Sequence, residues 1–397
     1  MMSRSDVLIL ASLIACISIA QCISTSLDNS ESVLNVGALL SLHGDSDNHG
    51  ISAQTALKIA ESDINRLFSD LGRPFRVSVV VADTNTNTES TQNALKELQA
   101  KGIKIIVGPE ESQSLADVLE YANKNGIILI SGASTAPALA IENDTIFRLA
   151  PDDATLAHLL AVMMQNDGIR VLVPLARRDL WADGMLNSTK SEFEQGDGIM
   201  LEAVRYDPQT TNFSSDLNIL RSEVRRAVKG NGADYVAVYV SAFDEIVTIL
   251  SQAAGDPVLS SVRWYGNDLS AVAISQNRSA AQFADATHFL SPVFGGMGGA
   301  KYEQIKKAVF DETGREASPF AANDYDALWL ITYAYLLAGS DDPEAFKLAF
   351  PVVAGRYRGE FGWMKLNDAG DLEDVPFTIA HLTRDNDTFK WEPYAIL

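Results

Sequence analysis

The stretch IKIIVGPEESQSLADVLEYANKNGIILISGAST, residues 103–135, decides the fold class of this 397-residue chain. A mainly apolar run at 103–107 predicts a strand, the spacing of apolar residues at 114–123 predicts a helix, and an apolar run at 127–130 predicts another strand. A strand, a helix and a strand in this order form a parallel pair of strands with the helix packed on one face. The stretch therefore predicts an α/β fold.

The same alternation continues from this unit toward both ends of the chain. Further strands are predicted at 33–40, 77–81, 170–174, 235–240 and 262–265, a β-hairpin at 359–371, and helices at 51–67, 88–101, 156–165, 185–194, 242–253, 301–310 and 325–338. The pattern restarts after 147–151, so we expect two doubly wound lobes with parallel-type sheets. Such sheets bind ligands outside the carboxyl ends of their strands.

The composition argues against several classes of function. The formal net charge of −21 disfavours nucleic-acid binding, because a phosphate backbone is bound by clustered Lys and Arg. Both cysteines, Cys16 and Cys22, lie near the N-terminus, which leaves the body without a cysteine nucleophile or a thiolate metal site. The five histidines are scattered, and no Gly-x-Ser-x-Gly motif occurs. We expect no enzyme activity, no metal and no cofactor.

Residues 1–32 are typical of a targeting leader followed by a polar tether. The run 7–19 is almost entirely apolar, which suits a signal segment and is short for a membrane span. Three alternatives stay open: lipidation of Cys16 after Leu-Ile-Ala, cleavage after Ala20, or an uncleaved anchor. We expect an extracytoplasmic protein anchored to the outer face of the cell membrane. Asn-x-Ser/Thr sequons favour a glycosylating exterior and start at Asn143, Asn187, Asn212, Asn277 and Asn386.

Six short segments, in this order and at these distances, carry a resemblance to a known family. They are VGALLS at 36–41, IIVGPEES at 105–112, ILISGASTAP at 128–137, GND at 266–268, GEFG at 359–362 and GDL at 370–372. From Val33 onward the chain resembles the type I periplasmic binding proteins, especially the branched-chain amino-acid receptors of ABC importers.

This resemblance implies two lobes joined by a three-strand hinge that closes on a ligand. The expected first lobe comprises 33–150 plus 291–358, and the expected second lobe comprises 151–290 plus 359–397. The expected crossings lie near 149–153, 289–293 and 358–361. The glycine cluster at 295–299 favours a flexible connection near a crossing over a phosphate loop, because no Walker pattern follows it.

The resemblance also implies where the ligand binds. Ser112 and Thr135 would contact its carboxylate, while the Ala133 carbonyl and Asp268 would face its ammonium group. Free N–H groups and hydroxyls at the start of a helix independently suit an anion at Ser112. The alternative is that Ser112 and Ser114 cap the helix, which uses the same donors. For Asp268 the alternative is a surface turn, since Asn-Asp is a common turn pair.

Two further residues are expected to wall the ligand. Trp181 and His49 stand where members of the family often carry aromatic residues. His49 makes the wall more polar than Tyr or Trp would, which argues against a purely aliphatic ligand side chain. Tyr239, Ser241 and Phe243 are alternatives for another wall position, with a core role favoured for Tyr239.

The sequence predicts a solute-binding protein of an ABC importer that captures an amino acid or a related small polar compound by hinge closure. The expected partners are this small-molecule ligand, the ABC permease subunits and, through the N-terminal anchor, the membrane. We expect a monomer that binds no nucleic acid. The alternative from another class is a ligand-sensing subunit of a signalling or chemotaxis receptor with the same fold, whereas no motif supports a secreted hydrolase.

Overall fold

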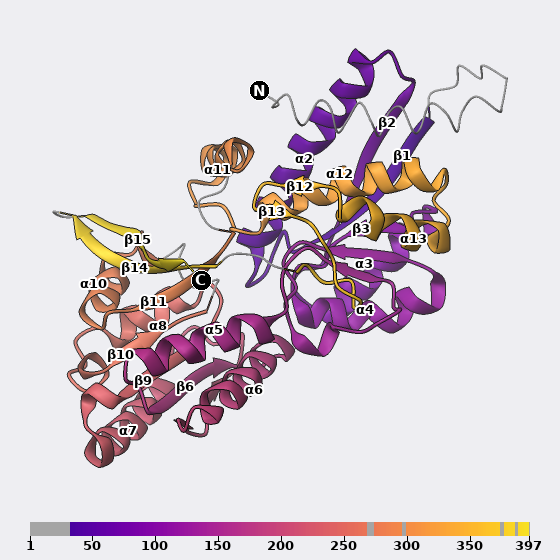
Figure 1. Ribbon diagram of the computed structural model, residues 1–397. Helices are drawn as coiled ribbons and strands as arrows, with labels where there is room; N and C mark the ends of the chain where they lie inside the picture. The colour runs from indigo at the N-terminus through magenta and orange to yellow at the C-terminus, as the bar shows by residue number, and fades with distance from the viewer. Residues whose placement is uncertain (1–31, 268–273, 296–298, 374–376, 386–387, 397) are drawn as a thin grey trace.

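The computed structural model describes residues 32–267, 274–295, 299–373, 377–385 and 388–396 (Figure 1). Within these ranges the strands form two large sheets, and helices cover both faces of each sheet. The two sheets belong to two lobes, the first at the upper right of Figure 1 and the second at the lower left. The predicted α/β fold with doubly wound, parallel-type sheets is confirmed.

The sheet of the first lobe is parallel throughout and has the strand order β2-β1-β3-β4-β5. Every residue of its central strands β3 and β4 is buried, which explains why residues 103–135 contain two wholly apolar runs. The strands are β1 (Ser32–Leu40), β2 (Phe75–Asp83), β3 (Ile105–Val107), β4 (Ile128–Ser131) and β5 (Ile146–Arg148).

Helices from both ends of the chain complete the first lobe. The helices α3 and α4 cover one face of its sheet, and α2 with α12 and α13 covers the other. α12 is buried over most of its length because it packs between the sheet, α2 and α13. The helices are α2 (Asp47–Asp70), α3 (Thr88–Ala100), α4 (Ser112–Asn125), α11 (Ala300–Thr313), α12 (Ala321–Ala338) and α13 (Pro343–Ala354).

The sheet of the second lobe has the order β15-β14-β11-β10-β9-β6-β7, and β8 also pairs with β6. The strands from β6 to β11 pair in parallel, and β14 and β15 add an antiparallel edge. The strands are β6 (Val171–Arg177), β7 (Ile199–Met200), β8 (Val204–Tyr206), β9 (Val236–Ser241), β10 (Arg263–Tyr265), β11 (Leu290–Phe294), β14 (Phe377–Asp385) and β15 (Thr388–Ile396).

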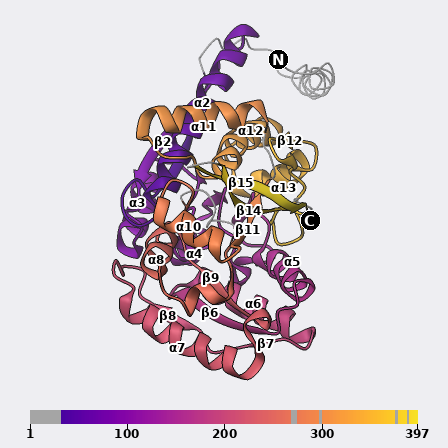
Figure 2. The same cartoon turned by 90° about the vertical axis from the view of Figure 1, so that its left-hand side faces the viewer.

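Helices α5 and α6 pack together on one face of this second sheet, and α7, α8 and α10 cover the other. Figure 2 shows the second lobe below the first, with α7 at the end farthest from α12. The helices are α5 (Asp153–Asn166), α6 (Leu180–Gln195), α7 (Ser214–Asn231), α8 (Ile246–Ala253) and α10 (Arg278–Ala286).

The lobe boundaries in the structure differ from the predicted ones at two places. β11 lies in the second sheet, paired with β10 and β14, although 291–358 was expected in the first lobe. The segment after α13 stays with the first lobe, because β12 (Arg358–Gly359) pairs with β13 (Gly362–Trp363) and the Glu360 N–H donates to Asp326 of α12 (2.9 Å). The chain therefore passes between the lobes after β5, between β11 and α11, and between Leu372 and β14.

A buried ion pair joins two of these crossings. The Arg148 guanidinium, which is 0% exposed, donates two hydrogen bonds to the Asp371 carboxylate, each 2.6 Å long. It also donates to the Ala136 carbonyl (2.7 Å), and backbone hydrogen bonds link Arg148 to Gly370 and Leu372. The first and third crossings are thus fixed side by side.

Replacing Asp371 with Ala is expected to destabilise the protein by about 3–5 kcal/mol, because the substitution leaves the buried Arg148 charge with only the longer ion pair to Asp152 (3.4 Å). Urea unfolding followed by circular dichroism measures this change. Asp368→Ala, at an exposed position in the neighbouring turn, is the control and should cost no more than about 0.5 kcal/mol. Equal stabilities of the two variants would contradict the role assigned to the ion pair.

Candidate functional site

A cavity lies between the two lobes, at the carboxyl ends of the strands. Its first-lobe wall comes from the segments after β1, β3 and β4 and from the start of α12, and its second-lobe wall comes from the segments after β6 and β9. This position is the one expected for ligands of doubly wound sheets. The lining residues are Ser46, His49, Glu110, Glu111, Ser112, Ala133, Thr135, Trp181, Phe243 and Phe320.

Two glycines let the first-lobe segments come together at this wall. A side chain at Gly50 would meet the Ser41 carbonyl oxygen at 2.2 Å, so the start of α2 can pack directly on the end of β1. Gly108 has a φ of +88°, and a side chain there would meet the Leu39 carbonyl oxygen at 2.2 Å. Glycine is the residue that combines positive φ with such close backbone approach. These contacts bring His49 and the segment 110–112 to one wall.

Five of the six predicted ligand-binding residues line the cavity: His49, Ser112, Ala133, Thr135 and Trp181. Asp268 lies outside the described residues. The grouping of the five around one cavity is a structural finding, and their contact with a ligand stays a prediction.

The hydroxyls of Ser112 and Thr135 already have partners within the protein. Ser112 Oγ hydrogen-bonds to Ser134 Oγ (3.0 Å) and accepts from the Ala136 N–H (3.2 Å). Thr135 Oγ1 donates to Asp153 Oδ2 (2.8 Å). Both side chains therefore shape the loops after β3 and β4, whatever further contact they make with a ligand.

The second-lobe wall is aromatic, with the Trp181 and Phe243 rings 4.8 Å apart between centroids. From the first lobe, the His49 ring lies 6.5 Å from the Phe243 ring and 6.5 Å from the Phe320 ring of its own lobe. The Asp179 side chain caps α6 by accepting from the Ala182 N–H, which fixes the first turn that carries Trp181.

The structure also decides among the three alternatives at the end of β9. Phe243 lines the cavity, whereas Tyr239 and Ser241 are fully buried in the strand. Tyr239 therefore has the core position that the sequence favoured for it, and the chain reaches the cavity at Phe243.

A group of buried carboxyls next to the cavity was missed by the sequence reasoning. Glu110 is 5% exposed, Glu111 follows it, and Asp324 of α12 lies beside Glu110. Burial raises the pKa of Glu110 well above its usual range, and the nearby charges of Asp324 and Glu111 raise it further. Burial likewise raises the pKa of Asp324 to about 8. The sequence offered one signal for these carboxyls, namely two adjacent acidic residues directly after a predicted strand. Because the chain has 52 Asp and Glu residues, such a pair does not stand out.

An ion-pair cluster spans the two lobes beside the cavity. Arg177, at the end of β6, donates to Asp45 of the first lobe (2.8 Å), to Glu245 of the second lobe (3.0 Å) and to Asp179. Its guanidinium also lies 3.8 Å from the centre of the Phe243 ring, so one arginine links the lobes and supports an aromatic wall residue.

Within the described ranges, no helix combines the length and apolar character that crossing a membrane requires. The described part of the chain also brings together no group of three or more His, Cys, Asp or Glu side chains that could hold a metal ion.

Two sheet-based lobes built from alternating segments of the chain, with a cavity between them, define the class of two-lobed binding proteins. The chain belongs to the periplasmic binding protein family, whose profile matches residues 33–371. This confirms the family resemblance and supports a solute-binding role and an extracytoplasmic location at the level of the family.

Individual relatives cover nearly the whole chain. It is 26% identical to the uncharacterized protein MJ1266 of Methanocaldococcus jannaschii over 91% of this chain and 90% of that protein. The leucine-binding protein LivK of Thermotoga maritima superposes with a TM-score of 0.74 at 18% identity, over 92% and 98% of the two chains. A solute-binding protein of an R. palustris ABC transporter, solved with 4-hydroxybenzoate, superposes with a TM-score of 0.76 at 12% identity, over 92% and 97%.

The buried Asp324 carboxyl predicts a specific pH dependence of stability. Its pKa of about 8 in the folded state exceeds the value of about 3.9 in an unfolded chain, so folded protein keeps a proton that the unfolded chain releases. Stability should therefore fall as the pH rises from about 4 to about 8.

Asp324→Asn has no proton to lose and should keep more of its melting temperature than wild type between pH 6 and pH 9, as measured by differential scanning calorimetry. Asp341→Asn, at an exposed position, should behave like wild type. If the Asp324→Asn variant loses as much as wild type, Asp324 does not carry this pH dependence.

Proposed function

We propose that this protein is the extracytoplasmic solute-binding component of an ABC importer and captures an amino acid or a related small polar compound. The observation that carries the proposal is the cavity between the lobes, which takes its walls from both of them. The names of the matching proteins support it, since they include a leucine-binding protein and an ABC transporter protein bound to 4-hydroxybenzoate. The ligand would be held by His49, Ser112, Ala133, Thr135 and Trp181, with Asp268 as the proposed ammonium contact.

The mechanism we propose is hinge closure. The crossings after β5 and before β14 are fixed side by side by Arg148 and Asp371, so the lobes can rotate about them without separating. A ligand that binds one wall first is then enclosed by the other, because it stabilises the closed state by its extra contacts there. The closed form is the one that would dock on the permease subunits.

The N-terminal leader completes this proposal. Lipidation at Cys16 would tether a monomer to the outer face of the membrane, close to the permease. Cleavage after Ala20 and an uncleaved anchor remain the alternatives. Metabolic labelling with a fatty-acid analogue, compared between wild type and Cys16→Ser, distinguishes the first route from the other two.

Ligand capture is tested by a thermal-shift screen of the purified protein against amino acids, amides, amines and aromatic acids. A ligand at 100 times its Kd should stabilise the folded state by about 2.7 kcal/mol and raise the melting temperature by several degrees. One chemical class should stand out, and the titrated binding should reach one ligand per chain without turnover. A flat response to the whole panel would contradict the proposal.

The ion pair between Asp45 and Arg177 should favour the closed state, because it joins the two lobes. Asp45→Asn is expected to weaken ligand binding by roughly two- to fivefold, since a partly exposed ion pair contributes up to about 1 kcal/mol. Asp47→Asn is the matched control: it breaks an ion pair with Arg315, in the same segment but within the first lobe. Equal affinities of the two variants in calorimetric titrations would argue against this role of Asp45.

A further inference from the structure

The first-lobe wall of the cavity holds carboxyl oxygens that lack a hydrogen-bond partner. Oε1 of Glu110 and Oε2 of Glu111 are buried and make no hydrogen bond within the described part of the chain. Glu111 Oε1, in contrast, accepts from Ser41 Oγ (2.7 Å). A buried carboxyl oxygen without a donor is costly, so oxygens of this kind at a cavity indicate that a ligand supplies the donor.

The closest charged neighbours of these carboxyls are mainly acidic. Among the described residues, Asp324 acts on Glu110 and Asp45 acts on Glu111, and both are acidic. His49 is the basic side chain that faces Glu111. Arg177 is engaged by three carboxylates of its own. Burial and these acidic neighbours raise the pKa of both glutamates. A positively charged group bound at this wall would offset that effect and favour the ionised form of both carboxyls, so the wall suits such a group.

The donors that would hold a ligand carboxylate at this wall are already engaged. Glu111 is the residue that precedes α4, and its side chain interacts with its own backbone N–H at the positive end of this helix. The Ser112 hydroxyl is bound to Ser134 and Ala136, and the Thr135 hydroxyl to Asp153. An anion placed at the start of α4 would therefore meet the Glu111 carboxyl there in place of a free backbone donor.

The remaining walls suit the same kind of ligand. Trp181, Phe243 and Phe320 present aromatic rings to the cavity. Ring faces attract ammonium and guanidinium groups, and rings combined with a carboxylate form a favourable environment for an organic cation.

We propose that this cavity selects ligands with a net positive charge on an amino or guanidino group and that they direct this group to Glu110 and Glu111 on the first-lobe wall. The proposal rests on the solute-binding function proposed above and narrows its ligand class from amino acids and related compounds to organic cations. The amine would donate hydrogen bonds to Glu110 Oε1 and Glu111 Oε2, with the aromatic rings packed around its carbon atoms.

The first experiment compares ligand classes by isothermal titration calorimetry on the purified protein. Ethanolamine, cadaverine and agmatine carry amino or guanidino groups and no carboxylate, L-leucine is a zwitterion, and benzoate is an anion. At least one of the three cations should bind about tenfold or more tightly than leucine and benzoate, as expected for one added charge-assisted hydrogen bond.

Tighter binding of leucine or benzoate than of every cation would overturn the inference and leave the solute-binding function standing. Absence of binding by all five compounds would overturn the inference as well, and the function itself if the broader thermal-shift screen is also flat.

The second experiment tests whether the cation binds at Glu110 and Glu111. Glu111→Gln keeps the oxygen that accepts from Ser41 and replaces the unpartnered one, so it should weaken binding of the best cation by about tenfold or more without lowering the melting temperature. Glu110→Gln should act in the same direction. Glu120→Gln, at an exposed position on the same helix α4, should leave the affinity unchanged. Wild-type cation affinity in both Glu110→Gln and Glu111→Gln would overturn the inference.

Discussion

The buried ion pair between Arg148 and Asp371 is the constraint on which the two-lobed arrangement depends. It holds together two crossings that are 223 residues apart in the chain, and water does not reach either partner. Beside the cavity, Arg177 and Asp45 join the two lobes directly, and Asp45 is partly exposed. A buried link between two crossings, combined with a weaker and solvent-accessible link between the lobes, permits rotation of the lobes about the crossings and separation at the weaker link.

The site concentrates features that lower stability. Glu110 and Asp324 are buried carboxyls next to each other, and neither is neutralised by a basic residue that the structure describes at its side. Buried polar groups without partners lower the stability of a core. They accumulate at binding sites, where a ligand supplies the missing hydrogen-bond or charge partners. In contrast, each buried guanidinium of Arg148 and Arg177 has several hydrogen-bond partners, as expected of charges that stabilise the fold.

Much of the fold could be predicted from the sequence because alternating strands and helices leave local patterns, and strand ends locate the cavity. The resemblance to a family supplied His49, Ser112, Ala133, Thr135 and Trp181. What it could not supply depends on contacts between distant segments. The apolar run at β11 does not say which sheet it joins, and only the packing on α12 shows that residues 358–372 stay with the first lobe. Nothing in the sequence distinguishes Glu110 and Glu111 from the many other acidic residues, and only the structure shows that they lie at the cavity.

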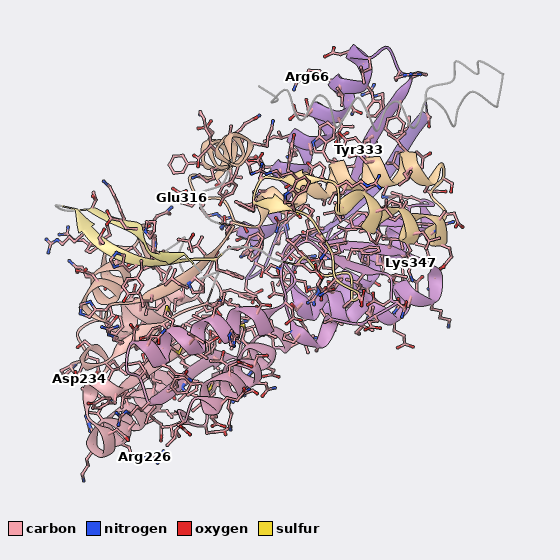
Figure 3. The ribbon with its side chains drawn as sticks, in the orientation of Figure 1. Arg66, Arg226, Asp234, Glu316, Tyr333 and Lys347 are labelled. Atoms are coloured by element: carbon pink, nitrogen blue, oxygen red, sulfur yellow. The ribbon has the colours of Figure 1, made fainter. Side chains whose placement is uncertain are left out.

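The interleaved path of the chain also sets an order of assembly. The first-lobe sheet is complete in sequence by Arg148, yet α12, which covers one of its faces, lies more than 170 residues later. The second lobe, by comparison, gathers its strands β6 to β11 and its helices from one continuous stretch. In Figure 3 the labelled Tyr333 lies on the first lobe, among elements from the start of the chain, whereas Asp234 and Arg226 lie on the second. A nascent chain therefore has this apolar sheet face covered by α2 alone until its last quarter has been synthesised, and the part that α12 and α13 will cover stays accessible to chaperones for most of its synthesis.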